Sequence, residues 1–447
     1  GGVIGSAIAS FTLADPAFRG TVTVVERDPT YARASSALSA SSIRQQFSTA
    51  INIEIGRYGI EFMRGIGDAL AVGGERPDIG LVEPGYLFLA SPAGAGILER
   101  NHALQRAHGV DVALLDPAAL RARFPWISTD GIAGGSLGLS GEGWFDGWSL
   151  LQAFRRHARS RGARYVTAEA VGFDATGQRI AAVRLADGSR IAGDVFIDAA
   201  GPWAASIARW VGVDLPVRAR RRCVFVFTCA TPIPHCPLVV DPTGLWFRPE
   251  GAGQFICGIS PDAANDPDDA PLDVDHALFD DALWPALATR VPAFEAIRQT
   301  QSWAGYYELN TVDRNGIVGP HPEWTNLVFA NGFSGHGIQQ SPAVGRGVAD
   351  LLVHGGYRTL DLSPLAFDRF ARGDAAALTP LQKHGLESFQ TAGCALCHSG
   401  PMFSDYKLHF IGTPGQRETR DFRTPTLRNL KHTPPYMHNG SLGTLTD

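Results

Sequence analysis

Two cysteines and a histidine near the end of the chain have the spacing that attaches a haem group. They stand in the segment Cys394-Ala-Leu-Cys397-His398, which is the C-x-x-C-H pattern of c-type haem attachment. Two thiols one helical turn apart can both add to the haem vinyl groups, and the adjacent imidazole then reaches the iron as its proximal ligand. We therefore predict haem c on Cys394 and Cys397, with His398 as the metal ligand. A thioredoxin-like C-x-x-C pair and half of a zinc site are the alternatives.

A second candidate site lies at the start of the chain, where Gly2 and Gly5 introduce a predicted helix over residues 6–14. An apolar stretch over residues 21–25 predicts a buried strand that ends at Glu26. A glycine-rich turn, a helix and a strand ending in an acid are typical of the βαβ unit that binds a dinucleotide. Gly2 would let the backbone approach the pyrophosphate, and Glu26 would accept hydrogen bonds from ribose hydroxyls. The alternative is a tight βα turn in another kind of α/β protein.

Similar elements recur later in the chain. Residues 193–200 predict a strand that runs into a turn at Gly201, and residues 326–330 predict another strand, followed by the glycine-rich run 331–337. A helix with small residues is predicted over residues 342–354. Strands that each end in glycines before a helix suggest one sheet, whose carboxyl edge holds an extended ligand.

Length and composition narrow the class of protein. The chain has 447 residues, of which 45% are hydrophobic and 19% charged; at roughly 150 residues per domain this predicts a globular protein of two or three domains. The net charge of −5 gives no sign of a nucleic-acid partner. No apolar run reaches the roughly 18 residues of a membrane span, so we expect none. Four cysteines are interpreted as small hydrophobic side chains: Cys223, Cys229, Cys236 and Cys257.

Segments spread over residues 1–372 carry a resemblance to a known family. They are SSIRQQFS (41–48), GYLF (85–88), WFD (144–146), AGPW (200–203), GYYELNTVD (305–313) and GFSGHG (332–337). Their order and spacing resemble the D-amino-acid-oxidase superfamily of FAD enzymes, in particular the branch that holds sarcosine and dimethylglycine oxidoreductases and the FAD-dependent oxidoreductase domain-containing proteins. The implied fold is α/β: a Rossmann-like FAD-binding domain (1–80, 145–215 and 311–372) interleaved with a mixed-sheet substrate domain (81–144 and 216–310).

The same resemblance implies a set of cofactor contacts. The residues expected to contact FAD are Gly2, Gly5, Glu26, Ser35, Ser36, Gly201, Trp203, Gly332, Gly335, Gly337 and Ile338. Those up to residue 26 would hold the ADP half, and residues 35 and 36 would lie in a loop that runs past the flavin. Those from residue 332 onward would present backbone N–H groups to the flavin carbonyl end. Preorganised donors there stabilise the negative charge that arrives with a hydride.

The reaction implied is oxidation of a C–H bond next to an amine, in a small amine or amino acid. The resemblance suggests three catalytic residues: Arg44, Tyr307 and His336. Arg44 would bind a substrate carboxylate, Tyr307 or its neighbour Tyr306 would orient the amine, and His336 would act as a base or as a hydrogen-bond donor. The alternatives are a salt bridge for the arginine, core positions for the tyrosines and a loop-stabilising role for the histidine.

Residues 379–447 resemble the C-terminal haem domain of the bacterial dihaem cytochrome c peroxidase family. The resemblance implies a small all-α cytochrome c-like domain after a linker at 373–378. No second C-x-x-C-H occurs, so this part would transfer electrons without reducing peroxide.

Two functions follow from these predictions. The first is an FAD-dependent oxidoreductase that passes electrons to its own haem, to a redox protein partner or to O2. The alternative is a cytochrome c peroxidase-like electron-transfer fragment joined to an independent flavin oxidase. The location would be periplasmic if the haem is attached, and cytoplasmic for the flavin part alone.

Overall fold

The structure is a computed structural model that describes residues 1–251, 253–261, 265–368, 408–409 and 422–423. The chain divides into two units, residues 1–367 and residues 368–447. The fold and the site described below belong to the first unit. The predicted linker and the predicted haem residues Cys394, Cys397 and His398 lie outside the described residues, and the described residues do not show an all-α domain there.

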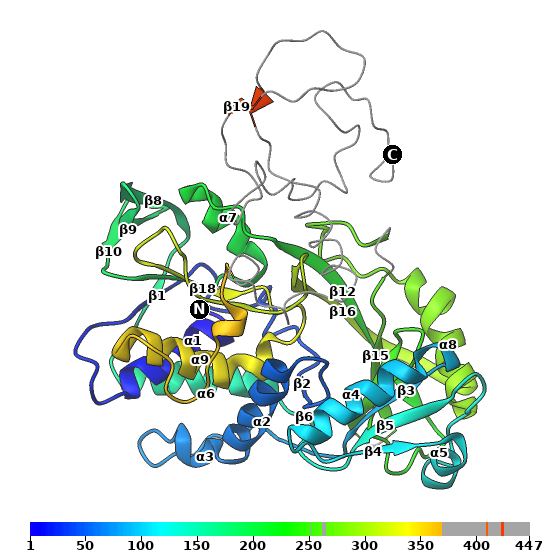
Figure 1. Cartoon of the computed structure of the whole chain (residues 1–447). Helices are drawn as coiled ribbons and strands as arrows, with labels where there is room; N and C mark the ends of the chain where they lie inside the picture. Colours follow the sequence, from blue (N-terminus) through cyan, green and yellow to red (C-terminus); the bar gives the residue numbers. More distant parts are fainter. Residues whose placement is uncertain (252, 262–264, 369–407, 410–421, 424–447) are drawn as a thin grey trace. The chain divides into compact units, whose positions relative to one another are not determined.

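Three helices pack side by side in the first unit: α1 (Val3–Ala14), α6 (Gly147–Ser160) and α9 (Gly337–His354) (Figure 1). Most residues of α1 are buried because the helix lies against both of the others. Gly345 on α9 permits this close approach, since a Cβ atom there would lie 2.7 Å from the Cβ atom of Ala7. The N-terminus of α6 is capped by Asp146, whose carboxylate accepts hydrogen bonds from the N–H groups of Trp148 and Ser149.

Helix α9 begins five residues before the predicted position, at Gly337 rather than at Pro342. A proline inside a helix removes one backbone hydrogen bond and usually marks a helix start. Here the carbonyl of Ile338, which Pro342 cannot reach with an N–H group, accepts a hydrogen bond from the hydroxyl of Ser341 at 2.9 Å. The local substitute donor lets the helix begin at the glycine-rich turn and continue through the proline.

The predicted strands at residues 21–25, 193–200 and 326–330 correspond to β1 (Thr23–Glu26), β11 (Phe196–Asp198) and β18 (Leu327–Asn331). Strand β1 pairs in parallel with β7 (Arg164–Thr167), and β18 pairs in parallel with β11 and antiparallel with β17 (Ile317–Pro320). Backbone hydrogen bonds therefore divide these strands into two sheets, where the sequence suggested one.

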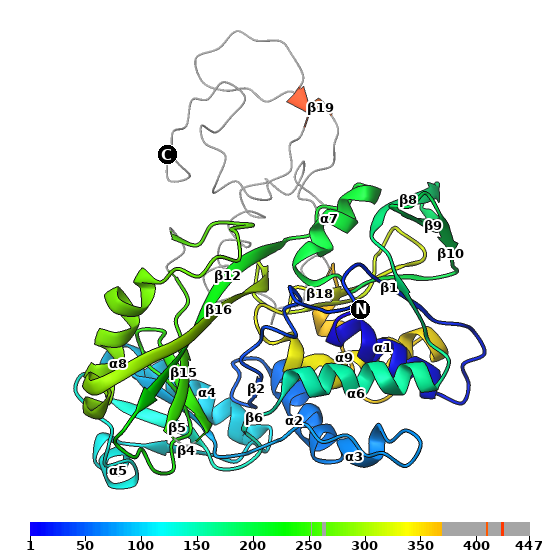
Figure 2. The same ribbon diagram turned by 180° about the vertical axis from the view of Figure 1, so that it is seen from behind.

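A mixed eight-stranded sheet has the order β16-β12-β15-β14-β13-β3-β5-β4. Its strands come from two stretches of chain, residues 86–138 and 217–310. The neighbours β3 and β13 are parallel, and the other pairs are antiparallel. Figure 2 shows the long strands β12 and β16 running together across the unit. Aromatic side chains including Phe225, Phe247 and Phe294 fill the core on this sheet, and all four cysteines predicted as hydrophobes are buried and free.

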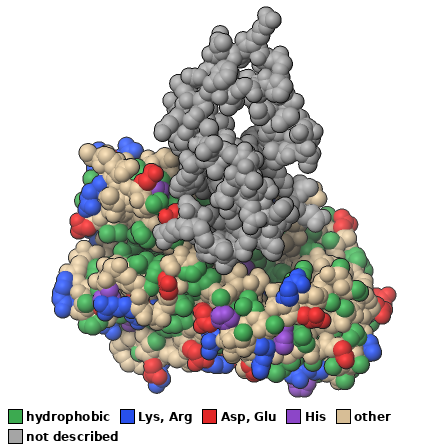
Figure 3. Space-filling view, in the orientation of Figure 1, with side chains coloured by type: hydrophobic (Ala, Val, Ile, Leu, Met, Phe, Trp, Pro, Cys, Tyr) green, Lys and Arg blue, Asp and Glu red, His purple; other side chains and the backbone are tan. Residues whose placement is uncertain are grey.

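The remaining helices and strands have the following bounds: α2 (Ala50–Arg64), α3 (Ile66–Ala69), α4 (Ala95–Ala107), α5 (Pro117–Arg123), α7 (Ala204–Ala208), α8 (Trp284–Arg290), β2 (Ser42–Ile43), β3 (Tyr86–Ala90), β4 (Val112–Leu115), β5 (Gly134–Gly138), β6 (Gly143–Trp144), β8 (Ala170–Thr176), β9 (Arg179–Leu185), β10 (Arg190–Ala192), β12 (Val217–Cys229), β13 (Leu238–Val240), β14 (Trp246–Gly251), β15 (Gln254–Gly258), β16 (Ile297–Asn310), β19 (Leu408–His409) and β20 (Phe422–Arg423). None of the described helices has the length and apolar character needed to cross a bilayer. On the face shown in Figure 3, acidic and basic side chains are interspersed over the described surface.

Candidate active site

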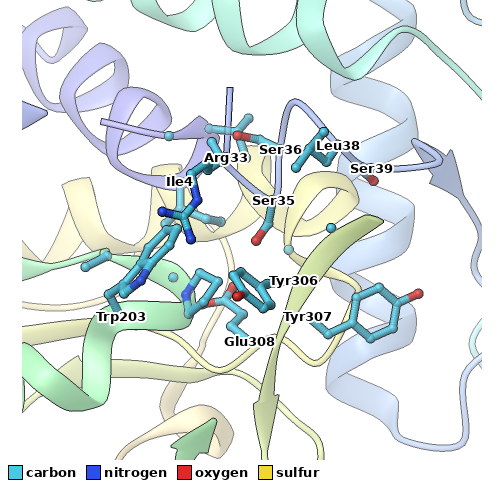
Figure 4. A pocket seen from close by; sticks show the side chains of 18 of the residues that line it. Ile4, Arg33, Ser35, Ser36, Leu38, Ser39, Trp203, Tyr306, Tyr307 and Glu308 are labelled. Atoms are coloured by element: carbon cyan, nitrogen blue, oxygen red, sulfur yellow. The ribbon is translucent and has the colours of Figure 1, made fainter. Parts of the chain in front are cut away.

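A cavity of about 680 Å³ lies where the N-terminus of α1, the carboxyl ends of β1 and β11, and strand β16 meet. Figure 4 shows its two walls. Ser35, Ser36 and neighbouring residues of the segment before β2 form one wall, and Trp203 and Glu308 lie on the opposite wall. The lining residues come from the two-stranded sheet of β1 and β7, from the three-stranded sheet of β11, β18 and β17, and from the eight-stranded sheet, as a site for an extended ligand requires.

Most of the residues predicted to contact a cofactor line this one cavity. They are Gly2, Glu26, Ser35, Ser36, Gly201, Trp203, Gly335, Gly337 and Ile338, with Tyr307 from the predicted catalytic set. Gly5, also predicted to contact FAD, lies outside the lining; the atom nearest to a Cβ placed there would be the Cβ of Ala199, at 3.8 Å. Gly332 donates its N–H group to Glu308 at 3.1 Å. Arg44 and His336 lie outside the lining and contact each other.

The residues around the cavity fit a dinucleotide such as FAD. Gly2 and Gly337 stand at the N-terminal ends of α1 and α9, where free backbone N–H groups favour anionic groups. A Cβ atom on Gly337 would be crowded, since it would lie 3.2 Å from Glu308 Oε1, whereas one on Gly2 would lie 3.4 Å from Ser36 Oγ, close to an ordinary contact. Ser35 Oγ and the Tyr31 hydroxyl are buried without a hydrogen-bond partner although both residues line the cavity. Buried polar atoms normally have hydrogen-bond partners, and a polar ligand in the cavity would supply partners for these two hydroxyl groups.

We expect the change Gly337→Ala to weaken the binding of FAD by at least about tenfold. The new methyl group would press on Glu308 and on Phe333, at 3.2 and 3.3 Å, and would displace the first turn of α9, whose residues Gly337 and Ile338 line the cavity. Titration of flavin-free protein with FAD, followed by flavin fluorescence, measures the affinity. Gly356→Ala is the matched control, because nothing lies within 4 Å of its Cβ position. Equal FAD affinity in the two variants would contradict this assignment of the α9 turn.

Two buried carboxyl groups at the cavity were not identified from the sequence: Glu308 lines it, and Asp198 stands just before the lining residues 199–203. Glu308 on β16 accepts a hydrogen bond from Gly332, and Asp198 at the end of β11 accepts one from Ala200 at 3.1 Å. Burial raises the pKa of Glu308 to about 8 and that of Asp198 to about 7. The only available signal was the placement of a glutamate after two tyrosines in a strand, where alternation sends Tyr306 and Glu308 to one face.

Arg44 lies half-buried among aromatic rings. Its guanidinium carbon lies 4.0 Å from the ring centre of Phe47, 5.2 Å from that of Phe88 and 6.0 Å from that of Tyr86. No aspartate or glutamate among the described residues forms an ion pair with it. Burial lowers the pKa of Arg44 from its usual value, yet a guanidinium remains charged in proteins. The salt-bridge alternative therefore finds no partner in the described part of the chain, and the guanidinium donates instead to the carbonyl of Gln46 and to His336.

His336 is a hydrogen-bond partner of this arginine. Its Nε2 atom lies 2.8 Å from Nη2 of Arg44. Because arginine has only donors, Nε2 must accept, and the remaining proton is on Nδ1. Burial, with the positive charge of Arg44, lowers the pKa of His336 to about 3, so the ring is neutral. This geometry favours a role in orienting Arg44 over a role as a base, since the nitrogen with a free electron pair is already engaged.

The two neighbouring tyrosines point in different directions, as alternation along β16 requires. The hydroxyl of Tyr306 donates to the carbonyl of Ala270 at 2.7 Å, which is consistent with a structural position. The phenol of Tyr307 points away from Tyr306 and Glu308 (Figure 4), and the guanidinium of Arg222 lies 5.1 Å from the centre of its ring. Burial raises the pKa of Tyr307, so its hydroxyl stays protonated and can donate a hydrogen bond.

The fold and this cavity are those of an FAD-dependent oxidoreductase. The family model described as DAO, FAD dependent oxidoreductase, matches residues 1–351, so the chain belongs to this family. FAD-dependent oxidoreductase domain-containing protein 1 of Xenopus laevis is 44% identical over 404 residues, covering 83% of this chain and 81% of that protein. The crystal structure of glycine oxidase from Geobacillus kaustophilus is 25% identical with a TM-score of 0.70, covering 82% of this chain and 96% of that chain.

One further match concerns a smaller part of the chain. Cytochrome-c peroxidase IdrP2 of Denitromonas iodatirespirans is 34% identical over 130 residues, covering 20% of this chain and 35% of that protein. The prediction of an FAD enzyme of this family is thus confirmed, whereas the match to the peroxidase is a similarity of limited extent.

Proposed function

We propose that this protein oxidises the C–N bond of a small amino acid or of a secondary amine that carries a carboxylate. The observation that carries the proposal is Arg44, a cation surrounded by Phe47, Tyr86 and Phe88 and without a carboxylate partner among the described residues. Such a group leaves a place for the carboxylate of a ligand. The name of the structurally similar glycine oxidase, which acts on an amino acid, supports the same substrate class.

Each described residue of the site has a definite task in this proposal. Arg44 binds the substrate carboxylate, and His336 holds the guanidinium in place through Nε2. The aromatic rings around Arg44 exclude water and so strengthen the ionic contact. The protonated hydroxyl of Tyr307 donates a hydrogen bond that orients the substrate on its approach from the eight-stranded sheet.

The cofactor would be held by the cavity residues. FAD, when bound, supplies the acceptor for the hydride of the C–H bond next to the amine. Gly2 and Glu26 would hold its ADP half, and Ser35, Gly201 and Gly337 would contact the rest. The α9 turn would place backbone N–H groups where negative charge develops.

The proposal is tested by matched pairs of compounds with and without a carboxylate. We expect anaerobic addition of proline, or of N-methylglycine, to bleach the oxidised-flavin absorbance far faster than pyrrolidine or dimethylamine does. The carboxylate would supply a charge-assisted contact to Arg44 that the simple amines lack. Bleaching of similar rate with both members of each pair would reject the carboxylate requirement, and no bleaching with any amine in a broader panel would reject the substrate class.

We propose further that the C-x-x-C-H segment carries haem c, which accepts electrons from the flavin one at a time. Its support is the sequence motif itself and the match to a cytochrome-c peroxidase. Rapid anaerobic mixing with substrate should show haem reduction that follows flavin reduction within the turnover time. Protein that contains haem but leaves it oxidised after the flavin is reduced would indicate two independent parts, and protein without covalent haem would reject the haem site.

A further inference from the structure

A buried glutamate holds the segment that carries Arg44. Glu142 lies in the turn between β5 and β6 and is 0% exposed. Its Oε1 atom accepts hydrogen bonds from the backbone N–H groups of Gln45, at 2.7 Å, and of Gln46, at 3.0 Å. Its Oε2 atom accepts one from the side-chain amide of Gln46 at 2.7 Å. All three donors belong to the two residues that directly follow Arg44.

The contacts continue from this carboxylate to the guanidinium. The carbonyl of Gln46 accepts a hydrogen bond from Nη1 of Arg44. The side-chain amide of Gln46 also donates to the carbonyl of Tyr86 at 3.0 Å, and Tyr86 is one of the rings around Arg44. Gln46 therefore helps to position the guanidinium of Arg44, together with His336, and Glu142 holds Gln46 in place.

The surrounding residues leave room for the carboxylate of Glu142. Gly138 leaves the space that it occupies, because a Cβ atom there would overlap with Oε2 of Glu142. Burial raises the pKa of Glu142 to about 7, but the hydrogen bonds that its two carboxyl oxygens accept all come from N–H groups, which favours the ionised form. A buried carboxylate is costly unless its hydrogen bonds are satisfied, so a position that serves only packing would be filled more cheaply by an apolar side chain.

We infer that Glu142 is a positioning residue for Arg44, and so sets the affinity of the site for the carboxylate of the substrate. The inference rests on the proposed function of Arg44. Glu142 does not line the cofactor cavity, so its effect on carboxylate binding is separable from FAD binding. A small displacement of a binding group sharply lowers its contribution to the binding of the ligand.

The test uses the change Glu142→Gln in the FAD-loaded full chain. A glutamine can still accept from the two backbone N–H groups, but its amide would face the side-chain amide of Gln46, donor against donor. The probes are benzoate and benzamide, which have the same shape and differ in charge, and their dissociation constants are measured from the change in flavin absorbance. We expect Glu142→Gln to raise the dissociation constant of benzoate about tenfold and to leave the binding of benzamide and the FAD content unchanged.

Glu83→Gln is the matched control. Glu83 accepts a hydrogen bond from the N–H group of Gly141 at 2.9 Å, in the same turn, and pairs with Arg64, but it does not contact residues 44–46. Its variant should bind benzoate as the original protein does. Equal weakening of benzoate and benzamide by Glu142→Gln, or unchanged binding of both, would overturn the inference.

A second variant decides the matter if Glu142→Gln does not fold. Gln46→Met removes only the side-chain amide that links Glu142 to the backbone carbonyl of Tyr86, and it should weaken the binding of benzoate selectively in the same direction. An unchanged preference for benzoate over benzamide in this variant would equally overturn the inference. If the original protein binds benzoate no better than benzamide, or if Arg44→Met leaves that preference intact, the failure belongs to the proposed carboxylate role of Arg44 itself, and the inference about Glu142 falls with it.

Discussion

Replacing Arg44 with methionine should raise the KM for an amino-acid substrate about 100-fold, while its effect on a simple amine remains small. Removing one partner of a buried, hydrogen-bonded charge pair costs about 3 kcal/mol, which corresponds to a factor of about 100 in affinity. Methionine fills similar volume among the rings of Phe47, Tyr86 and Phe88, so the change removes mainly the charge and the donors. Steady-state kinetics with proline and with pyrrolidine measure the two effects.

The matched control for this prediction is Arg57→Met. Arg57 belongs to the same stretch of chain, on α2, but its guanidinium is paired with Glu54 at 3.5 Å and is 46% exposed. A surface pair of this kind contributes little, so this variant should keep the original KM. Equal increases of KM for the amino acid and the amine in Arg44→Met would show that Arg44 supports the site without binding the carboxylate.

The second large effect concerns stability as a function of pH, and it comes from Glu308. Burial raises the pKa of this carboxyl from 4.5 to about 8 in the folded protein, so the folded state retains a proton that the unfolded state has already lost. Stability from this group is complete below about pH 4.5 and is lost as the pH rises toward 8. Between about pH 5 and pH 8 the free energy of unfolding should fall by up to about 1.4 kcal/mol per pH unit because of this group.

Glu308→Gln should remove this slope. A glutamine oxygen can still accept from the N–H group of Gly332, but the side chain no longer titrates. Urea unfolding at a series of pH values, with FAD in excess throughout, gives the free energies, and the difference between variant and original protein should grow as the pH rises. Glu75→Gln is the control, since that carboxylate is 77% exposed. Parallel curves for Glu308→Gln and the original protein would show that this carboxyl is ionised in the folded state at neutral pH.

These two variants also separate the two halves of the site. Glu308 lines the cavity and accepts a hydrogen bond from the glycine-rich turn 332–337, whereas Arg44 lies beside that turn and contacts it through His336. A change at Glu308 should therefore affect stability and FAD binding first, and a change at Arg44 should affect the substrate first. This division follows from which atoms each side chain touches.

Features that depend on neighbouring residues could be predicted from the sequence. The glycines before α1, the apolar strand β1 and the acid at its end are a local pattern, and the structure places Gly2 and Glu26 in one cavity as that pattern predicts. The α/β fold with a mixed sheet and the FAD-enzyme family were also predicted correctly, because the motifs that carry them are short and ordered along the chain. The start of α9 was predicted wrongly at residue 342, because the sequence does not show that the hydroxyl of Ser341 donates to the carbonyl of Ile338, which lacks its usual donor at Pro342.

Which polar side chains contact each other depends on the packing of distant segments and could be seen only in the structure. Arg44 and His336 are 292 positions apart, and Gln45 and Glu142 are 97 apart, so no local pattern connects them. Nor could the sequence reveal that Glu142 and Glu308 are buried, because the burial of a carboxyl depends on the elements that close over it. Desolvation and hydrogen bonding then set the pKa and the role of each group, and both arise only when distant segments pack together.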